Sequence, residues 1–310
     1  MWKRSLETAL GPDSVQENVS LAPFTTFRIG GPADLFLRAK TSDDLVRALT
    51  HARKLDIPTF LLGKGANVLV SDAGFRGLVV RSEVGGIEVL EEGKVEAGAG
   101  VEVYPDLIME TVRHGLGGLH HFVGIPSTVG GAMWQNLHFL SPAPPRARTV
   151  FIEEVVESAE ILSEEGEREV VDRGYFKFDY DYSILHERAD VVLSVTFRLT
   201  PTPKEDLTRV MEENLLWREA RHPDLSSLPS AGSIFKKIQG VGAGRLIDQC
   251  GLKGRTLGRA QIFERHANII VNLGGASASD VLALMELAQE VVARETGQEL
   301  VPEITLVGTF

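Results

Sequence analysis

The clearest pattern along the chain is the helical period of its apolar residues in two segments. Residues 41–55 begin with the capping residues Thr41 and Ser42 and then carry an apolar stripe on one face, which predicts a helix. Residues 277–297 carry the longest such stripe, and Gly297 is placed to end that helix. Further helices are predicted from Pro105 to about Gly115, over residues 205–222 and around residues 244–251.

Short apolar runs between glycine turns predict the strands. Residues 26–40 are predicted as a strand, a glycine turn and a second strand, and residues 77–100 as a β-meander. The other predicted strands lie in residues 57–63, 67–70, 151–200, 266–275 and 300–308. Because strands and helices show no sustained β-α-β-α alternation, the predicted fold class is α+β. The proline-rich residues 141–148 are predicted to form an exposed loop.

Length and charge narrow the possible functions. A chain of 310 residues is long enough for two or three domains or subdomains. It has 32 Lys and Arg against 43 Asp and Glu, a net charge of −11, which argues against a nucleic-acid binder that relies on its overall field. A local basic cluster can still bind a small anion.

The cysteine, the histidines and the apolar segments indicate whether disulfides, metal sites or membrane spans are expected. Cys250 is the only cysteine, so an internal disulfide or a multi-cysteine metal centre is excluded, and the eight histidines show no ligand spacing. We therefore predict no metal site. The N-terminus has no signal-like apolar region, and no apolar run approaches the ~18–20 residues of a membrane span. These features predict a cytoplasmic protein with no membrane partner.

Two glycine-rich segments are candidates for ligand binding. LLGKGANVLVSD (61–72) lacks the third glycine of a dinucleotide-binding fingerprint and the lysine position of a P-loop. It is either a plain hairpin turn or a nest of backbone N–H groups for a diphosphate. GIPSTVGGA (124–132) has small residues and two hydroxyls, which suit close approach of a flat or phosphorylated ligand, or tight packing between domains. The sequence alone leaves both alternatives open.

A third segment, PSAGSIFKK (229–237), places Ser233 in a glycine-flanked turn. Its S-x-x-K spacing occurs in serine acylases, but the S-D-N and K-T-G motifs of those enzymes are missing. The basic residues near this serine suit either an anionic ligand or a solvated surface: Arg218, Arg221, His222, Lys236, Lys237 and Arg245. Glu303, in the last predicted strand, is either an edge carboxylate or a catalytic acid.

Taken together, six segments resemble the MurB family, UDP-N-acetylenolpyruvoylglucosamine reductase. They are TTFRIGGPA (25–33), LLGKGANVLVSD (61–72), GIPSTVGGA (124–132), PSAGSIFK (229–236), GLKGRTLGRAQIFERHANIIVN (251–272) and LVPEITLVG (300–308). The resemblance covers nearly the whole chain. It implies a vanillyl-alcohol-oxidase-type FAD-binding fold with two α+β subdomains, residues 1–78 and 79–200. It also implies an α+β substrate-binding domain, residues 201–299, and a C-terminal strand, residues 300–310, that returns to the active site.

The resemblance further implies that the chain uses FAD and NADPH to reduce UDP-N-acetylglucosamine enolpyruvate to UDP-N-acetylmuramate, a step of peptidoglycan precursor synthesis. In this chemistry Ser233 donates a proton and Glu303 stabilises the developing enolate. The implied cofactor-binding residues are Arg28, Gly63, Lys64, Gly65, Ala66, Asn67, Val68, Ile125, Pro126, Ser127, Thr128 and Gly131. The implied substrate-binding residues are Arg218, Arg221, Lys236, Lys237 and Asn268.

The chain departs from the family pattern at three places. The family's Y-R-x-S signature, whose arginine polarises the substrate carboxylate, is here Tyr180-Asp181-Tyr182-Ser183. The small residues N-A-G-A-Y-G are replaced by the bulkier WQNLHFLSPAPPRAR (134–148), and Lys-Asn-Pro by a run beginning Lys236-Lys237. The segment between residues 184 and 217 is compact, as in the family's shorter subtype, which lacks a substrate-clamping tyrosine loop.

The exchange at Asp181 leaves two possibilities: another cation, such as Lys177, Lys236, Lys237 or a nearby arginine, replaces the missing arginine, or activity is impaired. For the whole chain, the alternatives to a reductase of this family are a different FAD-dependent oxidase or dehydrogenase of the same fold and a non-catalytic homologue that binds FAD or the UDP-sugar.

Overall fold

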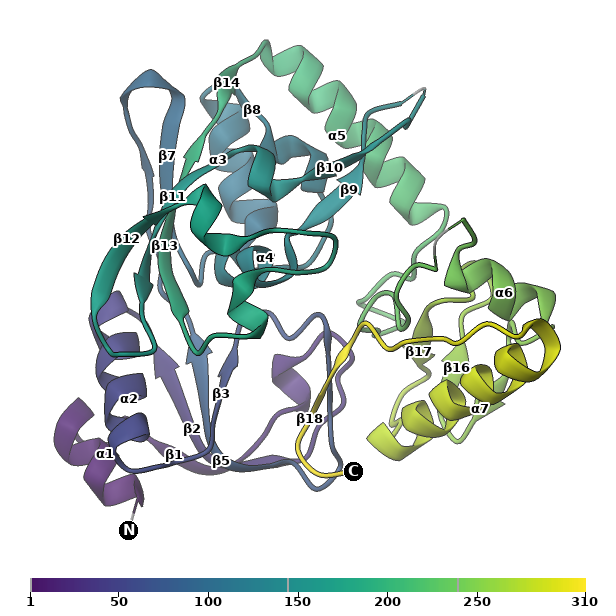
Figure 1. Cartoon of the computed structure of the whole chain (residues 1–310), viewed down its shortest axis with the longest axis horizontal. Coiled ribbons are helices and arrows are strands. Elements are labelled where there is room, and N and C mark those ends of the chain that lie inside the picture. Colours follow the sequence, from purple (N-terminus) through teal and green to yellow (C-terminus); the bar gives the residue numbers. More distant parts are fainter. Residues whose placement is uncertain (1, 144, 239) are drawn as a thin grey trace. The chain divides into compact units, whose positions relative to one another are not determined.

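A computed structural model describes residues 2–143, 145–238 and 240–310, which form two compact units (Figure 1). The first unit comprises Met1–Val15, Leu37–Lys64 and Val80–Arg218. The second unit comprises Gln16–Phe36, Gly65–Val79 and Glu219–Phe310. The chain therefore passes between the units several times. The predicted division into two FAD-binding subdomains, a substrate-binding domain and a returning C-terminal strand stays a prediction.

The first unit is organised around a five-stranded antiparallel sheet in the order β12-β11-β13-β7-β6. Its strands are β6 (Ile87–Val89), β7 (Lys94–Gly98), β11 (Val156–Leu162), β12 (Arg168–Asp172) and β13 (Val191–Arg198). Helix α4 (Val129–Gln135) packs against β13 and β7 (Figure 1). A large cluster of buried apolar residues, including Phe122, Phe176 and Phe197, lies in this unit and contributes hydrophobic stabilisation.

Two helices of the first unit, α2 (Ser42–Lys54) and α4, begin at a capping side chain. In α2, Thr41 and Asp44 form a reciprocal capping box, and the apolar stripe predicted for this segment is buried. Thr128 caps α4 by accepting a hydrogen bond from the Gly131 N–H. The other helices are α1 (Trp2–Leu10), α3 (Ile108–Arg113) and α5 (Lys204–Glu219). The remaining short strands of the first unit are β8 (Leu116–Gly117), β9 (His138–Leu140), β10 (Thr149–Phe151) and β14 (Thr200–Pro201).

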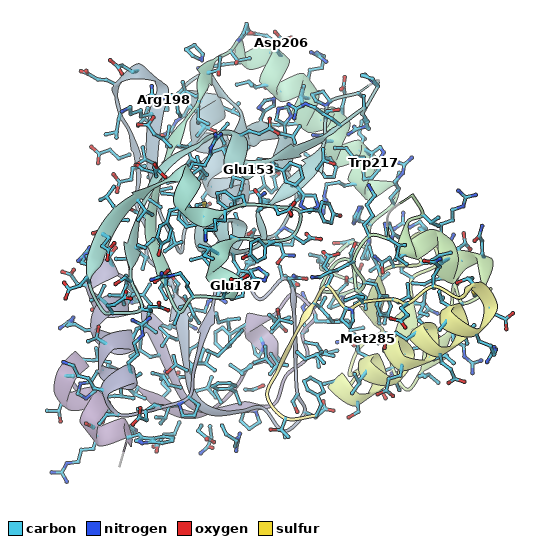
Figure 2. All side chains as sticks on the ribbon, in the orientation of Figure 1. Glu153, Glu187, Arg198, Asp206, Trp217 and Met285 are labelled. Carbon is cyan, nitrogen blue, oxygen red and sulfur yellow. The ribbon has the colours of Figure 1, made fainter. Side chains whose placement is uncertain are left out.

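In the second unit, helix α7 (Ala278–Thr296) lies along a three-stranded sheet in the order β15-β16-β17 (Figure 1). The strands are β15 (Thr256–Leu257), β16 (Ala260–Ile262) and β17 (Ile270–Asn272), and α6 (Ala243–Gln249) packs on α7. Met285, labelled on α7 in Figure 2, is 1% exposed within this core. The last strand, β18 (Thr305–Val307), pairs in parallel with β4 (Val68–Val70).

A four-stranded sheet in the order β1-β2-β5-β3 completes the fold. Its strands are β1 (Gln16–Ser20), β2 (Pro32–Ala39), β3 (Thr59–Leu62) and β5 (Phe75–Ser82), and β2 and β5 each contribute residues to both units. No helix among the described residues has both the length and the apolar character that crossing a membrane requires.

Most predicted elements are confirmed, with two informative differences. The strand predicted from residue 26 to the glycine turn is wrong: residues 26–31 form a turn in which Arg28 has a φ of 53°. Left-handed backbone cannot continue a strand. No helix is predicted in the glycine-rich residues 129–135, yet α4 forms there because its cap and its buried Val129, Ala132 and Met133 outweigh the cost of two helical glycines. The predicted loop 141–148 has no helix or strand in its described residues, and Pro144 lies outside them.

Candidate active site

Ser233 and Glu303, far apart in the sequence, are brought together by backbone hydrogen bonds in the second unit. Ser233 forms an isolated bridge with Ile269, and the Ile234 N–H donates to the Asn268 carbonyl over 2.8 Å. On the other side, the Glu303 N–H donates to the Ile234 carbonyl, also over 2.8 Å. Ile234, the residue after the serine, is thus hydrogen-bonded to the glutamate. The fold therefore brings together the backbone segments that carry the predicted proton donor and the predicted acid.

The glycine loop that follows Lys64 joins the same arrangement. The Asn67 side-chain amide donates to the Glu303 carbonyl over 3.4 Å, and the Thr305 N–H donates to the Asn67 carbonyl over 2.9 Å. Val68 then begins the pairing of β4 with β18. The predicted cofactor loop and the predicted catalytic glutamate consequently share one network of backbone contacts.

This loop also fits a diphosphate. The backbone N–H groups of Gly65, Ala66 and Asn67 make no hydrogen bond with a described residue. Consecutive free N–H groups in a tight turn form an anion-binding concavity. Free consecutive N–H groups are what the phosphate-cradle alternative for residues 61–72 needs, and binding of a diphosphate there stays a prediction.

Gly65 itself occupies a position that a larger residue does not fit. Its φ is +65°, and an added Cβ would lie 2.9 Å from the Thr25 Cα and closer still to the Phe24 carbonyl oxygen. The Gly65 carbonyl accepts from the Thr26 N–H over 3.0 Å, so the two segments have little freedom to separate.

Gly65→Ala is therefore expected to lower FAD occupancy sharply and to destabilise the protein by at least ~1–2 kcal/mol, since both the left-handed backbone and the contact with Phe24 oppose a side chain. The ratio of the 450 nm flavin absorbance to protein concentration, with the melting temperature, measures both effects. Gly242→Ala is the control, because an added Cβ there meets nothing within 4 Å. Equal flavin content in both variants would contradict the role assigned to the loop.

Arg28 and the segment before Ser233 lie close together. The Thr26 hydroxyl donates to the Ser230 carbonyl over 2.7 Å, and the Ser230 N–H donates back to the Thr26 carbonyl over 3.1 Å. The exposed Arg28 guanidinium donates to the Ser226 carbonyl over 3.2 Å. Arg28 therefore lies in the same unit as Gly65 to Val68 and the serine turn.

The predicted substrate-binding residues of this unit differ in their surroundings. Asn268 is buried, and its amide accepts from the Phe235 N–H over 3.0 Å and donates to the Phe235 carbonyl over 2.8 Å. These contacts hold the segment after Ser233 in place. Lys236, Lys237 and Arg221 are exposed and accessible to an anionic ligand. A direct contact of Asn268 with substrate stays a prediction.

In the first unit, Gly63 and Lys64 lie beside Thr128. An added Cβ at Gly63 would lie 2.5 Å from the Thr128 hydroxyl, and the Gly63 carbonyl accepts from Arg81 over 2.7 Å. Burial lowers the pKa of the Arg81 guanidinium below its ordinary value. Lys64 forms an ion pair with Glu102, which makes an isolated bridge with Thr128. Arg81 and Glu102 support the predicted cofactor residues, and no motif in the sequence indicates them.

The loop that contains Ile125, Pro126, Ser127, Thr128 and Gly131 leads directly into α4. The Gly130 N–H donates to the Ala99 carbonyl over 2.8 Å, and the Ser127 hydroxyl donates to the Thr128 carbonyl over 2.9 Å. Gly131 is exposed, so small residues leave backbone accessible at the start of the helix. This geometry is compatible with a flat ligand against the loop.

Arg218, the last predicted substrate residue, ends the first unit. Its guanidinium lies 5.6 Å from the centre of the Phe139 ring, and Trp217, labelled in Figure 2, meets the same ring edge-on at 5.5 Å. Burial lowers the pKa of Arg218 to about 10, so it remains a cation at neutral pH. Among the residues that the structure describes, no group of three or more His, Cys, Asp or Glu side chains is placed to hold a metal ion.

Comparisons with known proteins define the class first. Residues 33–171 match the FAD-binding domain family, so the protein is a flavin-binding protein whose cofactor domain contains the glycine loop. Residues 223–307 match the C-terminal domain of UDP-N-acetylenolpyruvoylglucosamine reductase. That match contains Ser233 and Glu303.

The relatives then define the family. The reductase of that name from Moorella thermoacetica is 39% identical over 294 residues, which cover 95% of this chain and 93% of the relative. The one from Gloeobacter violaceus is 38% identical over 300 residues, covering 96% and 97%. The crystal structure of the Thermus caldophilus enzyme, MurB, aligns with a TM-score of 0.77 at 34% identity, covering 94% of this chain and 98% of that one. The chain belongs to the UDP-N-acetylenolpyruvoylglucosamine reductase family.

This assignment confirms the predicted resemblance, the α+β fold class, the FAD and NADPH cofactors and the class of FAD-dependent oxidoreductase. The individual roles of the site residues stay predictions, which the geometry above supports.

Proposed function

We propose that the chain reduces UDP-N-acetylglucosamine enolpyruvate to UDP-N-acetylmuramate with electrons from NADPH, in peptidoglycan precursor synthesis. The observation that supports this most directly is the pairing of the Ser233 turn with the segment of Glu303 through the 2.8 Å hydrogen bond between Glu303 and Ile234. The backbone segments that carry the serine hydroxyl and the glutamate carboxyl group therefore meet in one unit, and the loop that we propose for the diphosphate is hydrogen-bonded to the segment of Glu303 through Asn67.

Bound FAD would supply the hydride chemistry, and the residues that would hold it are Gly63 to Val68 and those of the Ser127–Gly131 loop. The residues of the protein must then stabilise the negative charge that forms on the substrate and donate a proton to it. When a hydride adds to the terminal carbon of the enolpyruvyl group, negative charge develops toward its carboxylate. Glu303, in its protonated form, donates a hydrogen bond to that enolate, and the Ser233 hydroxyl donates a proton to the neighbouring carbon.

The substrate also carries a diphosphate, which needs cations. Lys236, Lys237 and Arg221 are exposed in the unit that contains Ser233, and Arg218 precedes them in the chain. In a protein of net charge −11, such exposed cations in the unit of Ser233 are suited to the diphosphate of a UDP-sugar. We place this reaction in the cytoplasm, where NADPH and nucleotide sugars are available, with neither nucleic acid nor membrane as a partner.

An anaerobic two-step absorbance experiment tests the proposal. One equivalent of NADPH is expected to bleach the flavin band of the purified protein, and UDP-N-acetylglucosamine enolpyruvate is then expected to restore it rapidly. A band that returns only when oxygen is admitted would identify a different flavin oxidase or dehydrogenase. A protein that retains FAD but is not reduced by NADPH would be a non-catalytic homologue.

A further inference from the structure

Thr26 contacts two of the segments to which the proposed chemistry is assigned. Its backbone N–H donates to the Gly65 carbonyl over 3.0 Å, and its hydroxyl donates to the Ser230 carbonyl over 2.7 Å. The Ser230 N–H donates back to the Thr26 carbonyl over 3.1 Å. All three residues belong to the second unit. One threonine therefore joins the glycine loop to the turn that leads to Ser233.

The hydroxyl and the backbone of Thr26 serve different partners. The hydroxyl oxygen also lies 3.4 Å from the Gly65 carbonyl oxygen, but a hydroxyl has a single hydrogen, which goes to the nearer Ser230 carbonyl. The glycine loop is therefore held by the Thr26 N–H, and the serine turn is held by the Thr26 hydroxyl. A substitution that removes only the hydroxyl can separate the two contacts.

The contact with Gly65 bears on the direction of the N–H group that follows it. A trans peptide unit is planar, and its N–H points away from its carbonyl. Because Thr26 lies on the carbonyl side of the peptide between Gly65 and Ala66, the Ala66 N–H points away from Thr26. That N–H has no hydrogen-bond partner among the residues that the structure describes. The Thr26 backbone thereby orients one of the N–H groups predicted for the diphosphate.

The contact with Ser230 bears on Ser233. The Ser230 hydroxyl oxygen accepts from the Gly232 N–H over 3.0 Å, which closes a short turn directly before the predicted proton donor. Directly after Ser233, the next backbone N–H donates to the Asn268 carbonyl over 2.8 Å. The backbone of the serine is therefore held on both sides, through Thr26 before it and through Asn268 after it.

Asn272 ties the same two segments at a second point. Its backbone N–H donates to the Pro229 carbonyl over 2.8 Å, and its side-chain amide donates to the Phe27 carbonyl over 3.0 Å. The residue is 3% exposed. Residues 26–27 and 229–230 are therefore expected to stay together when one hydroxyl is removed, so that a change at Thr26 alters the turn without unfolding it.

We propose that Thr26 is a positioning residue for the protonation step: its hydroxyl fixes the turn that carries Ser233, and its backbone N–H ties that turn to the cofactor loop. Thr26 acts through Ser233 and donates no proton to the substrate itself. The proposal rests on the proposed function, because Thr26 has this role only if Ser233 is the proton donor.

The experiment compares Thr26→Val with the wild-type protein, since valine keeps the branched side chain and the backbone hydrogen bonds but has no hydroxyl. Reoxidation of the reduced flavin by the enolpyruvyl substrate is expected to slow about 10- to 100-fold, because a displacement of ~1 Å in a reacting group can cause a loss of this size. FAD affinity, measured by titration of the apoprotein, and reduction by NADPH are expected to stay at their wild-type values. Thr26→Ser restores the hydroxyl and is expected to recover most of the rate. Thr26→Ala replaces the valine variant if that variant does not fold.

Two further variants test whether Thr26 acts through the serine. Added to Ser233→Ala, Thr26→Val is expected to slow reoxidation little further, because both changes affect one group. Thr296→Val is the matched control, since the Thr296 hydroxyl also donates to a backbone carbonyl over 2.7 Å, that of Val292 in α7. The control is expected to change neither half-reaction.

Three outcomes would overturn the proposal. Wild-type reoxidation in Thr26→Val, at any melting temperature, would show that the hydroxyl is only structural. Weaker FAD binding, or NADPH reduction slowed as much as reoxidation, would show that the hydroxyl supports the cofactor and not the serine. Additive losses in the double variant would show that Thr26 acts independently of Ser233. Failure of the proposed function appears differently, as a wild-type reduced flavin that the substrate does not reoxidise, and it would overturn both proposals.

Discussion

Ser233→Ala is expected to slow reoxidation of the reduced flavin by the enolpyruvyl substrate about 10²- to 10⁴-fold, the usual contribution of a positioned general acid. Reduction of the flavin by NADPH is expected to continue at the wild-type rate, because that half-reaction needs no proton from the serine. Anaerobic stopped-flow absorbance at 450 nm measures the two half-reactions separately. The split between them is the signature of a proton donor.

The control for this variant is Ser227→Ala. Ser227 lies six residues earlier in an exposed turn and donates its hydroxyl to Asp224. It is expected to change neither half-reaction. If Ser233→Ala reoxidised at the wild-type rate, the proton would come from another group, and the role proposed for Ser233 would be wrong.

Glu303→Ala is expected to lower the rate of substrate reduction about 10²- to 10³-fold, the cost of removing one donor to a developing oxyanion. The backbone of Glu303 keeps its hydrogen bonds to Ile234 and Asn67 in this variant, so the segment is expected to stay in place. Glu303→Gln retains an N–H donor. It is expected to recover part of the loss if Glu303 acts by hydrogen bonding.

The comparison of these two variants separates the roles of the carboxyl group. A glutamine variant as slow as the alanine variant would show that Glu303 supplies a proton and not a hydrogen bond. Glu299→Gln, at an exposed glutamate four residues earlier, is the control. Rates are measured as single-turnover reoxidation of the flavin, with FAD content as the check on folding.

Local chemistry let the sequence predict much of this protein. Helices α2 and α7 follow from their apolar stripes and capping residues, because the signal for each lies within a few helical turns. The glycine loops, the serine turn and the late glutamate are contiguous motifs, so the family resemblance and the cofactor class could be inferred from them. Net charge and the single cysteine are properties of the chain as a whole, and by themselves they argue against a nucleic-acid binder and exclude a disulfide scaffold.

Features that depend on contacts between residues far apart in the sequence were decided only by the tertiary structure. The turn at residues 26–31 replaces a predicted strand because its backbone must approach Gly65 and Ser230. Asn268 bonds with Phe235, and Glu303 with Ile234, across separations that no sequence period encodes. Hydrophobic periodicity reports only which face of an element is buried, whereas the choice of partner is made by packing and hydrogen bonding in the folded chain.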